Sequence, residues 1–185
     1  FPTRRSSDLF IKTRKKPRHP MAAFSNKLVT SNDYDEVSVT NEDFAAILLL
    51  LEDGIRAQVN VSQMAAGRKN RLYYEINGAK KSLAFDQEHA NELWIGNRDK
   101  ANEILLRDPS LTHAEAREIM TYPGGHLEGY PDTMKQHFSK IYRYVTNGDF
   151  HAEKDFGTLE DGHQILKINE AIEKSAREER WVSVD

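Results

Sequence analysis

The sequence predicts an α+β domain: an open, mainly antiparallel β-sheet with helices packed on one face. Short apolar or alternating runs follow one another between residues 36 and 108, and such short links favour antiparallel neighbours. Asp53-Gly54 and Asn77-Gly78 stand between runs of this kind, and both dipeptides are strong hairpin signals. From residue 131 onward the apolar spacing changes to the helical period.

The strands are predicted from apolar runs and from alternation. Residues 55–62 alternate most clearly, which should direct two sets of side chains to opposite faces. One set is Ile55, Ala57, Val59 and Val61, and the other is Arg56, Gln58, Asn60 and Ser62. We expect helices to cover the first set, while the second faces water, a substrate, a second domain or a partner subunit. Further strands are predicted at 44–51, 70–76, 82–85, 92–95, 103–106 and 181–184.

Two helices are predicted in the last third of the chain. Pro131 suits a first helical turn, and Met134, Phe138, Ile141 and Val145 then form one apolar stripe over 131–147. Asn147-Gly148 is expected to end this helix. Thr158, followed three residues later by Asp161, resembles a capping box and predicts a second helix over 158–178.

The composition is that of an ordinary globular domain. The chain has 185 residues, a net charge of −3 and a pI near 6.2, which argues weakly against a nucleic-acid binder. Its longest apolar run, 45–51, is far shorter than the roughly 20 residues of a membrane span, and we expect a cytoplasmic protein. Without cysteine, disulfides and thiolate chemistry are excluded. A basic cluster (Lys12, Arg14, Lys15, Lys16 and Arg18) is interrupted by prolines and is interpreted as a solvated loop rather than a phosphate patch.

Residues 1–9 are interpreted as an artefact. Their sequence, FPTRRSSDL, is what a common DNA sequencing adapter encodes, so the biological chain is expected to be 10–185. No GxGxxG fingerprint is present, because Gly124-Gly125 lacks that spacing. His126 and Glu128 form the nearest metal-like pair, and two ligands are too few for a metal site.

Two segments stand out as candidate binding elements. The first, 65–71, is a cationic link between two strands and includes Arg68 and Asn70. The second, 122–131, is a Gly-rich loop that brings His126, Glu128 and Tyr130 to the start of a helix. A solvated hairpin for the first and a plain helix-entry loop for the second remain equally good interpretations on composition alone.

Several separated motifs resemble one family in the right order. Residues 62–72 fit S-x-x-x-x-G-R-x-N-R-L, 75–83 fit a family run of the type E-I-x-G-x-x-G-S-L, and 124–132 read GGHLEGYPD. Together with 161–163 (DGH), they resemble the C-terminal domain of the glucose-fructose oxidoreductase/inositol dehydrogenase/MocA (Gfo/Idh/MocA) family, a dihydrodipicolinate-reductase-like fold. The resemblance covers about 34–184; Lys81 departs from it, standing where the family more often has glycine.

This resemblance implies a role beside a missing domain. Full-length members carry an N-terminal Rossmann domain that binds NAD or NADP, and oxidise or reduce a sugar, cyclitol or related polyol between the two domains. Their acid/base lysine and Asp/His pair lie before the point where this chain begins, so no catalytic, cofactor-binding or metal-binding residue is assigned here. The implied substrate-binding residues are Arg68, Asn70 and His126, with Glu128 and Tyr130 behind them. A homodimer or homotetramer through the open sheet face is also implied.

A different class of function competes with this one. A free-standing, non-catalytic binding module would use the polar sheet face alone. An upstream dinucleotide fingerprint in the source DNA would favour the oxidoreductase, and a start codon just before Phe10 would favour the module.

Overall fold

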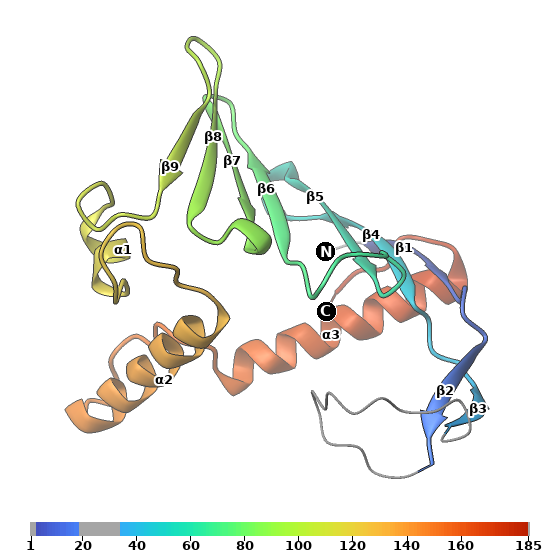
Figure 1. Ribbon diagram of the computed structural model, residues 1–185. Helices are drawn as coiled ribbons and strands as arrows, with labels where there is room; N and C mark the ends of the chain where they lie inside the picture. The colour runs from blue at the N-terminus through green and yellow to red at the C-terminus, as the bar shows by residue number, and fades with distance from the viewer. Residues whose placement is uncertain (1–2, 19–33, 185) are drawn as a thin grey trace. The chain divides into compact units, whose positions relative to one another are not determined.

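The computed structural model describes residues 3–18 and 34–184, which form two compact units (Figure 1). The first unit comprises residues 1–66 and 159–185, and the second comprises 67–158. Every strand pair in the described residues is antiparallel. The α+β fold class with mainly antiparallel sheets is therefore confirmed.

The first unit is built on a three-stranded sheet with β4 (Phe44–Leu50) at its centre. Its neighbours are β1 (Thr3–Asp8) and β5 (Arg56–Ser62). Backbone pairing of this kind needs no particular side chains, so an edge of β4 accepts almost any extended segment. The position of β1 consequently says nothing about the origin of residues 1–9, whose assignment to an adapter stays a prediction.

Helix α3 (Leu159–Glu178) covers one face of this sheet. Ala45 and Ile47 of β4 bury themselves against Ile172 of the helix, with Leu49 and Ile168 packed alongside. In the register of β4 and β5, Ala57, Val59 and Val61 lie opposite Leu49, Ile47 and Ala45 and so share the helix-facing side. The alternation predicted for 55–62 is confirmed over Arg56–Ser62, whereas Ile55 lies before β5 and is 58% exposed. Val59 and Val61 remain exposed because β5 is the edge strand.

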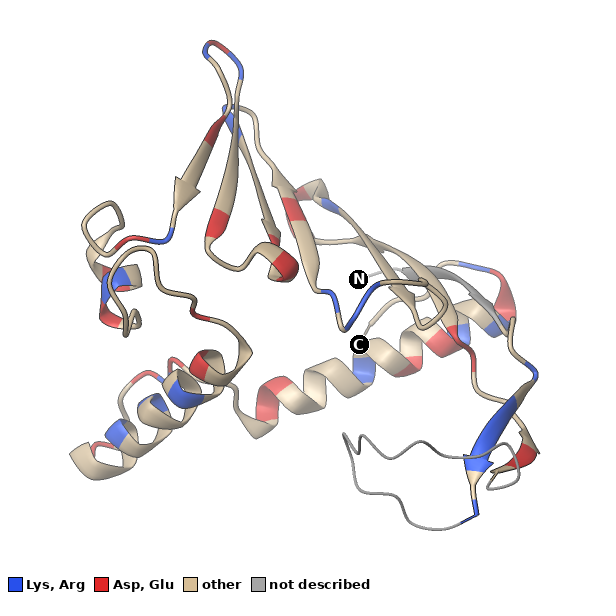
Figure 2. Cartoon of the chain, viewed as in Figure 1, with Lys and Arg blue, Asp and Glu red and all other residues tan. Residues whose placement is uncertain are grey.

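The basic cluster is a strand and not the predicted loop. Residues Thr13–Pro17 form β2, which pairs with β3 (Tyr34–Ser38) in a two-stranded ribbon. Lys15 lies opposite Glu36, and Arg18 forms an ion pair of 2.8 Å with Asp35. Opposite charges across the ribbon, visible in Figure 2, offset the repulsion that would otherwise oppose an extended basic run.

The second unit contains a four-stranded sheet in sequential order. Its strands are β6 (Tyr73–Asn77), β7 (Lys81–Asp86), β8 (Glu92–Asn97) and β9 (Glu103–Leu106). A short helix, α1 (Ala114–Glu118), and a long one, α2 (Tyr130–Asn147), follow. The sequence analysis missed α1, whose five residues are too few to show a helical period.

The long helices and the hairpin turns agree closely with their predictions. The helices predicted over 131–147 and 158–178 are confirmed as α2 and α3, each within one residue at its start. Gly148 follows α2 in a left-handed conformation with φ of 71°. Asp53 and Gly54 both have positive φ, 55° and 75°, as a primed hairpin turn requires.

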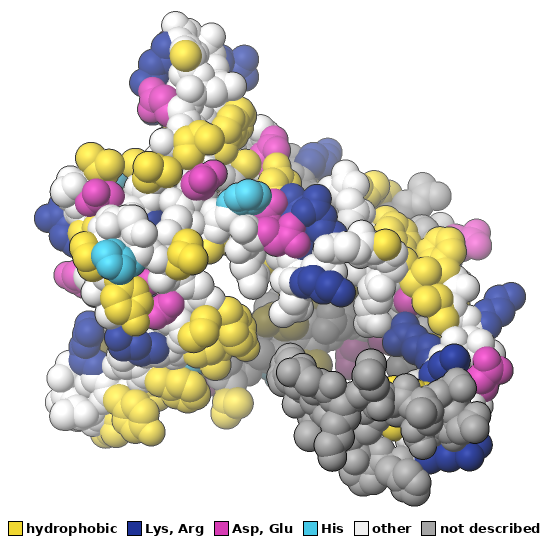
Figure 3. Space-filling model, viewed as in Figure 1, with side chains coloured by type: hydrophobic (Ala, Val, Ile, Leu, Met, Phe, Trp, Pro, Cys, Tyr) yellow, Lys and Arg dark blue, Asp and Glu magenta, His cyan; other side chains and the backbone are white. Residues whose placement is uncertain are grey.

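Three details differ from prediction. The strand expected from residue 70 begins at Tyr73, because Asn70 has a left-handed φ of 59° that interrupts the extended run. The segment 181–184 contains a single bridge residue, Val182, rather than a strand. The α2 stripe, expected to pack on the sheet with α3, is largely exposed at Met134, Phe138 and Val145, and Figure 3 shows hydrophobic side chains uncovered along α2.

No helix within residues 3–18 and 34–184 combines the length and apolar character needed to cross a bilayer.

Candidate functional site

The Gly-rich loop before α2 is shaped by a tight turn at Pro123–His126. The N–H of His126 donates to the carbonyl of Pro123 at 3.4 Å, and Gly125 has φ of 84°. Positive φ at the third residue of such a turn favours glycine. Gly124 is required for a different reason, since a Cβ atom there would lie 2.5 Å from Oδ2 of Asp108. Both glycines are therefore explained by the backbone of the loop.

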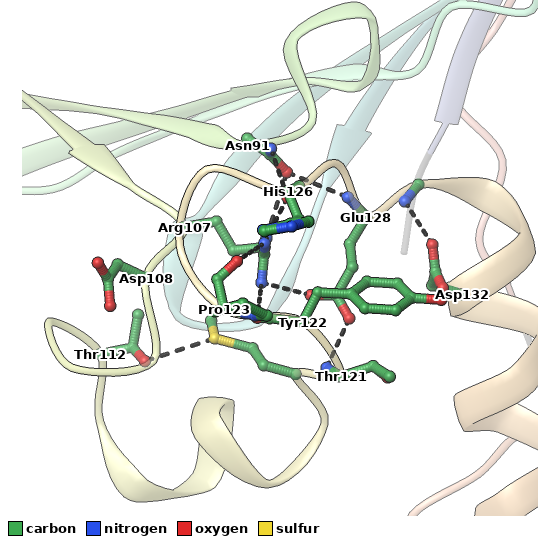
Figure 4. A network of polar contacts seen from close by, with 12 residues as sticks. Asn91, Arg107, Asp108, Thr112, Thr121, Tyr122, Pro123, His126, Glu128 and Asp132 are labelled. Atoms are coloured by element: carbon green, nitrogen blue, oxygen red, sulfur yellow. Dashed lines mark hydrogen bonds and ion pairs between the residues drawn. The ribbon is translucent and has the colours of Figure 1, made fainter.

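A buried arginine holds this loop in place (Figure 4). Arg107 follows β9 directly, and only 10% of its side chain is exposed. Its guanidinium donates to the carbonyls of Tyr122 at 2.9 Å and Pro123 at 3.0 Å, and also to the carbonyl of His126. Three peptide planes of the loop are thus directed toward one side chain.

Glu128 belongs to the same network. Its carboxylate pairs with Arg107 at 2.6 Å and accepts the N–H of Thr121 at 2.6 Å, so it closes the loop end to end. Asn91 completes the network by donating to the carbonyl of His126 at 3.0 Å and accepting from Arg107 at 3.2 Å. The carboxylate of Glu128, predicted to stand behind His126 in the pocket, contacts Arg107 and the Thr121 N–H of the loop, and a role toward a ligand stays a prediction.

His126 and Tyr130 are more accessible than Glu128. His126 is exposed at the end of the turn, and its main-chain oxygen accepts both Arg107 and Asn91. Tyr130 is the first residue of α2 and 64% exposed. These two side chains can reach a ligand that approaches the loop from outside.

The cationic link leads from β5 to β6, and each is an edge strand of its own sheet. Arg68 forms an ion pair with Glu88, and Arg71 forms a bidentate pair with Asp86, 2.6 Å at its shortest. The guanidinium of Arg71 also lies 4.7 Å from the ring centre of Tyr73. Asn70, between the two arginines, is exposed and left-handed.

The turn between β7 and β8 connects the two candidate segments. Asp86 and Glu88, at the start of this turn, hold the arginines of the link, while Asn91, at its end, holds the His126 loop. In an antiparallel sheet the start of β6, the end of β7, the start of β8 and the end of β9 lie at one end. Arg68, Asn70 and His126 therefore occupy the same end of the four-stranded sheet.

A hollow of about 370 Å³ opens on one face of this sheet, near the same end. This volume is within the roughly 300–1,000 Å³ usual for small-molecule pockets. Its walls include Tyr73, Glu75, Asp86, His89, Glu92, Trp94 and Ile104. Aromatic faces and carboxylates in one hollow suit a polyhydroxylated ligand, which presents both C–H surfaces and hydroxyl donors.

Two carboxylates of the hollow are held in their charged form. The hydrogen bond from Arg71 lowers the pKa of Asp86, and the hydrogen bonds from Asn77 and then Tyr73 lower the pKa of Glu75. Both groups therefore act as hydrogen-bond acceptors at neutral pH. Sequence reasoning singled out neither of them, because their role depends on which strands become neighbours.

The described residues do not fit a dinucleotide or a metal ion. A dinucleotide site of the Rossmann type needs parallel strands joined through a glycine-rich turn to a helix, and the strand pairs described here are all antiparallel. Within the same residues, no three His, Asp or Glu side chains gather as metal ligands.

An antiparallel α+β unit differs from the parallel architecture of a Rossmann nucleotide-binding domain. The model of the oxidoreductase family C-terminal alpha/beta domain matches residues 11–184. The chain belongs to this family, the Gfo/Idh/MocA oxidoreductases, as the motif order predicts.

Relatives of known structure share the fold over most or all of the chain. An oxidoreductase domain protein from Kribbella flavida is 26% identical with a TM-score of 0.77, over 100% of this chain and 46% of that one. An inositol dehydrogenase homologue from Azotobacter vinelandii, solved with NADH and myo-inositol, is 23% identical with a TM-score of 0.71. The match covers 77% of this chain and 39% of that one.

A curated relative points to the same group of enzymes. Levoglucosan dehydrogenase from Pseudarthrobacter phenanthrenivorans is 25% identical over 146 residues, which are 77% of this chain and 36% of that protein. A structure of levoglucosan dehydrogenase with NADH and L-sorbose has a TM-score of 0.77 at 21% identity, over 100% of this chain and 44% of that one. The chain thus spans less than half the length of these relatives.

Proposed function

We propose that residues 10–185 are the substrate domain of an NAD- or NADP-dependent oxidoreductase that acts on a sugar, cyclitol or related polyol. The observation that carries the proposal is that Arg68, Asn70 and His126 share one end of the four-stranded sheet, near which a hollow of about 370 Å³ opens, although none of the three lines that hollow. Relatives solved with myo-inositol or L-sorbose support this substrate class. The cofactor belongs to a separate nucleotide-binding domain.

The role of these side chains is to bind and orient hydroxyl groups. Arg68 has N–H donors beyond its contact with Glu88, Asn70 offers an amide, and His126 offers an imidazole. Fixing several hydroxyls fixes the carbon that reacts, and this orientation contributes directly to rate. Tyr130 extends the same surface at the start of α2.

The test uses the parent protein, with its nucleotide-binding domain, and single alanine variants. Loss of one hydrogen bond from His126 or Asn70 to an uncharged hydroxyl costs about 0.5–1.5 kcal/mol, which lowers kcat/KM roughly 2- to 13-fold. Loss of a charge-assisted bond from Arg68 costs about 1.5–3 kcal/mol. Unchanged kinetics in all three variants would reject the site.

Matched controls lie elsewhere in the chain. Arg18→Ala removes an ion-paired arginine whose side chain is 53% exposed, the same fraction as that of Arg68. His151→Ala removes an exposed histidine from a different loop. Both controls should keep the kinetics of the unmodified enzyme, because neither residue belongs to the candidate site.

We also propose that the open face of the three-stranded sheet is a subunit interface. Phe44, Ala46, Leu48 and Leu50 share this face with Ser62, Asn60, Gln58 and Arg56, which gives it a mixed apolar and polar character. Leu48 is 45% exposed at its centre. Leu48→Asp should therefore shift the mass measured by light scattering toward the monomer, whereas an unchanged mass would count against this face.

A further inference from the structure

The Arg107 guanidinium is engaged at all three of its nitrogens. Nε donates to Asn91, one terminal nitrogen donates to Tyr122 and forms the ion pair with Glu128, and the other donates to Pro123 and His126. With 10% of the side chain exposed, Arg107 is turned toward the loop and not toward a ligand.

The partners of Arg107 are concentrated on one short loop. Three of its five contacts are main-chain oxygens between residues 122 and 126, and a fourth is Glu128, two residues beyond. Such a fork fixes the positions of successive peptide planes relative to the end of β9. The Cα atom of His126, one bond from an anchored carbonyl, is fixed with them.

We propose that Arg107 is the positioning residue of the substrate site, which presents His126 to the ligand, with Asn91 and Glu128 as its supports. The catalytic consequence rests on the function proposed above, whereas the effect on the loop does not. Arg107 touches no substrate in this arrangement and acts entirely through the main chain of the loop.

Lysine cannot replace arginine in this role. An ammonium group has three donors that radiate from one atom, whereas the planar guanidinium separates its donors over a fork that reaches five acceptors. In Arg107→Lys the charge for Glu128 remains, but several of the carbonyls of Tyr122, Pro123 and His126 lose their donor. The variant therefore separates loop geometry from charge.

The first experiment follows the backbone conformation of the loop in residues 1–185 through its amide NMR signals. In Arg107→Lys we expect the signals of Gly124, Gly125 and His126 to shift or broaden, with the β4 and α3 signals unchanged. The matched control is Arg117→Lys, since Arg117 donates to a single carbonyl, that of Thr112, outside the loop. Loop signals that do not change in Arg107→Lys would overturn the proposal whatever the protein binds.

A second variant covers the case in which Arg107→Lys fails to fold. Glu128→Gln keeps an oxygen that can accept the Thr121 N–H but loses the ion pair with Arg107, so it should disturb the loop less than Glu128→Ala. That order of effects, read from the same three amide signals, supports a graded positioning role. Equal effects in the two variants would contradict it.

The kinetic experiment separates this inference from the proposed function. In the parent enzyme, Arg107→Lys should lower kcat/KM for a polyol by no more than the roughly 2- to 13-fold expected for His126→Ala, because it acts through the position of His126. The double variant with Arg107→Lys and His126→Ala should then have nearly the same kcat/KM as His126→Ala alone, because Arg107→Lys acts through His126. If His126→Ala alone is without effect, the proposed site fails; if the two losses are additive, the positioning role fails.

Discussion

Replacing Gly125 with alanine tests the geometry of the loop most directly. Gly125 has φ of 84° with open space around it, so an added methyl group meets no neighbour and only the backbone conformation opposes it. Forcing an L residue into the left-handed region costs about 1–2 kcal/mol. The loop cannot relax without giving up contacts to Arg107, so this cost should appear as lost stability of the second unit.

Gly157 provides the matched control. It too has open space, but its φ lies outside the left-handed region, and Gly→Ala at such a position stabilises by about 0.4–1 kcal/mol through the unfolded chain. Because the unfolded-chain gain is common to both Gly→Ala changes, the two variants should differ by the left-handed strain alone, roughly 1–2 kcal/mol in the free energy of unfolding. Urea titrations followed by tryptophan fluorescence measure this difference, since Trp94 lies in the same unit as both glycines.

Proteolysis gives a second measure of the same change. If the strain of Gly125→Ala is released by opening of the loop, a protease should cut between residues 121 and 129 faster than in Gly157→Ala. Indistinguishable stability and cleavage in the two variants would refute the argument that the left-handed turn holds the loop.

Three further outcomes follow from the structure. Ile172→Ala removes a side chain that is 9% exposed in the core of the first unit and should cost about 2–5 kcal/mol in thermal or urea unfolding, against almost nothing for Ile165→Ala, which is 58% exposed. Asp43, 2% exposed, accepts the N–H groups of Phe10 at 3.0 Å and Ile11 at 2.8 Å, and its pKa is lowered chiefly by the Phe10 hydrogen bond. A lowered pKa means stability that is fully present above about pH 4 and lost as the pH falls further, so unfolding between about pH 2 and 5 should depend less steeply on pH in Asp43→Asn. Purified residues 10–185 should leave NADH fluorescence unchanged and should oxidise no polyol, and fluorescence quenching at micromolar cofactor would contradict the assignment to a substrate domain.

Local chemistry made the hairpins and the long helices predictable. Asp53-Gly54 tolerates two successive positive φ angles, so the sequence alone predicts the turn between β4 and β5. Gly148 likewise ends α2, and the alternation of 55–62 correctly predicts the face that packs on α3. In each case the residues that predict the feature lie within a few positions of the turn, helix end or strand that they form.

The contacts that build the site depend on distant pairs, which a single sequence does not reveal. Arg107 and Glu128 are 21 positions apart, and the motif containing Glu128 predicts a ligand-facing group as readily as an ion pair. A buried carboxylate requires a cation or several donors, so the need for a partner is predictable, but its identity is not. The strand β2 was missed for a similar reason, because its charges are compensated by β3, beyond a proline-containing stretch.

The pairing of the site arginines bears on the kind of ligand that this end of the sheet accepts. Arg68, Arg71 and Arg107 each have a carboxylate partner: Glu88, Asp86 and Glu128. An anionic ligand would have to compete with these carboxylates, and the Arg107 side chain is only 10% exposed. A neutral polyhydroxylated ligand avoids that competition, since its hydroxyls accept from the remaining N–H groups and donate to carboxylates such as Asp86 and Glu75, whose pKa values are lowered. For the proposed substrate site, the local charge balance therefore favours an uncharged sugar or cyclitol over a sugar acid or phosphate, even though the composition of the link is cationic.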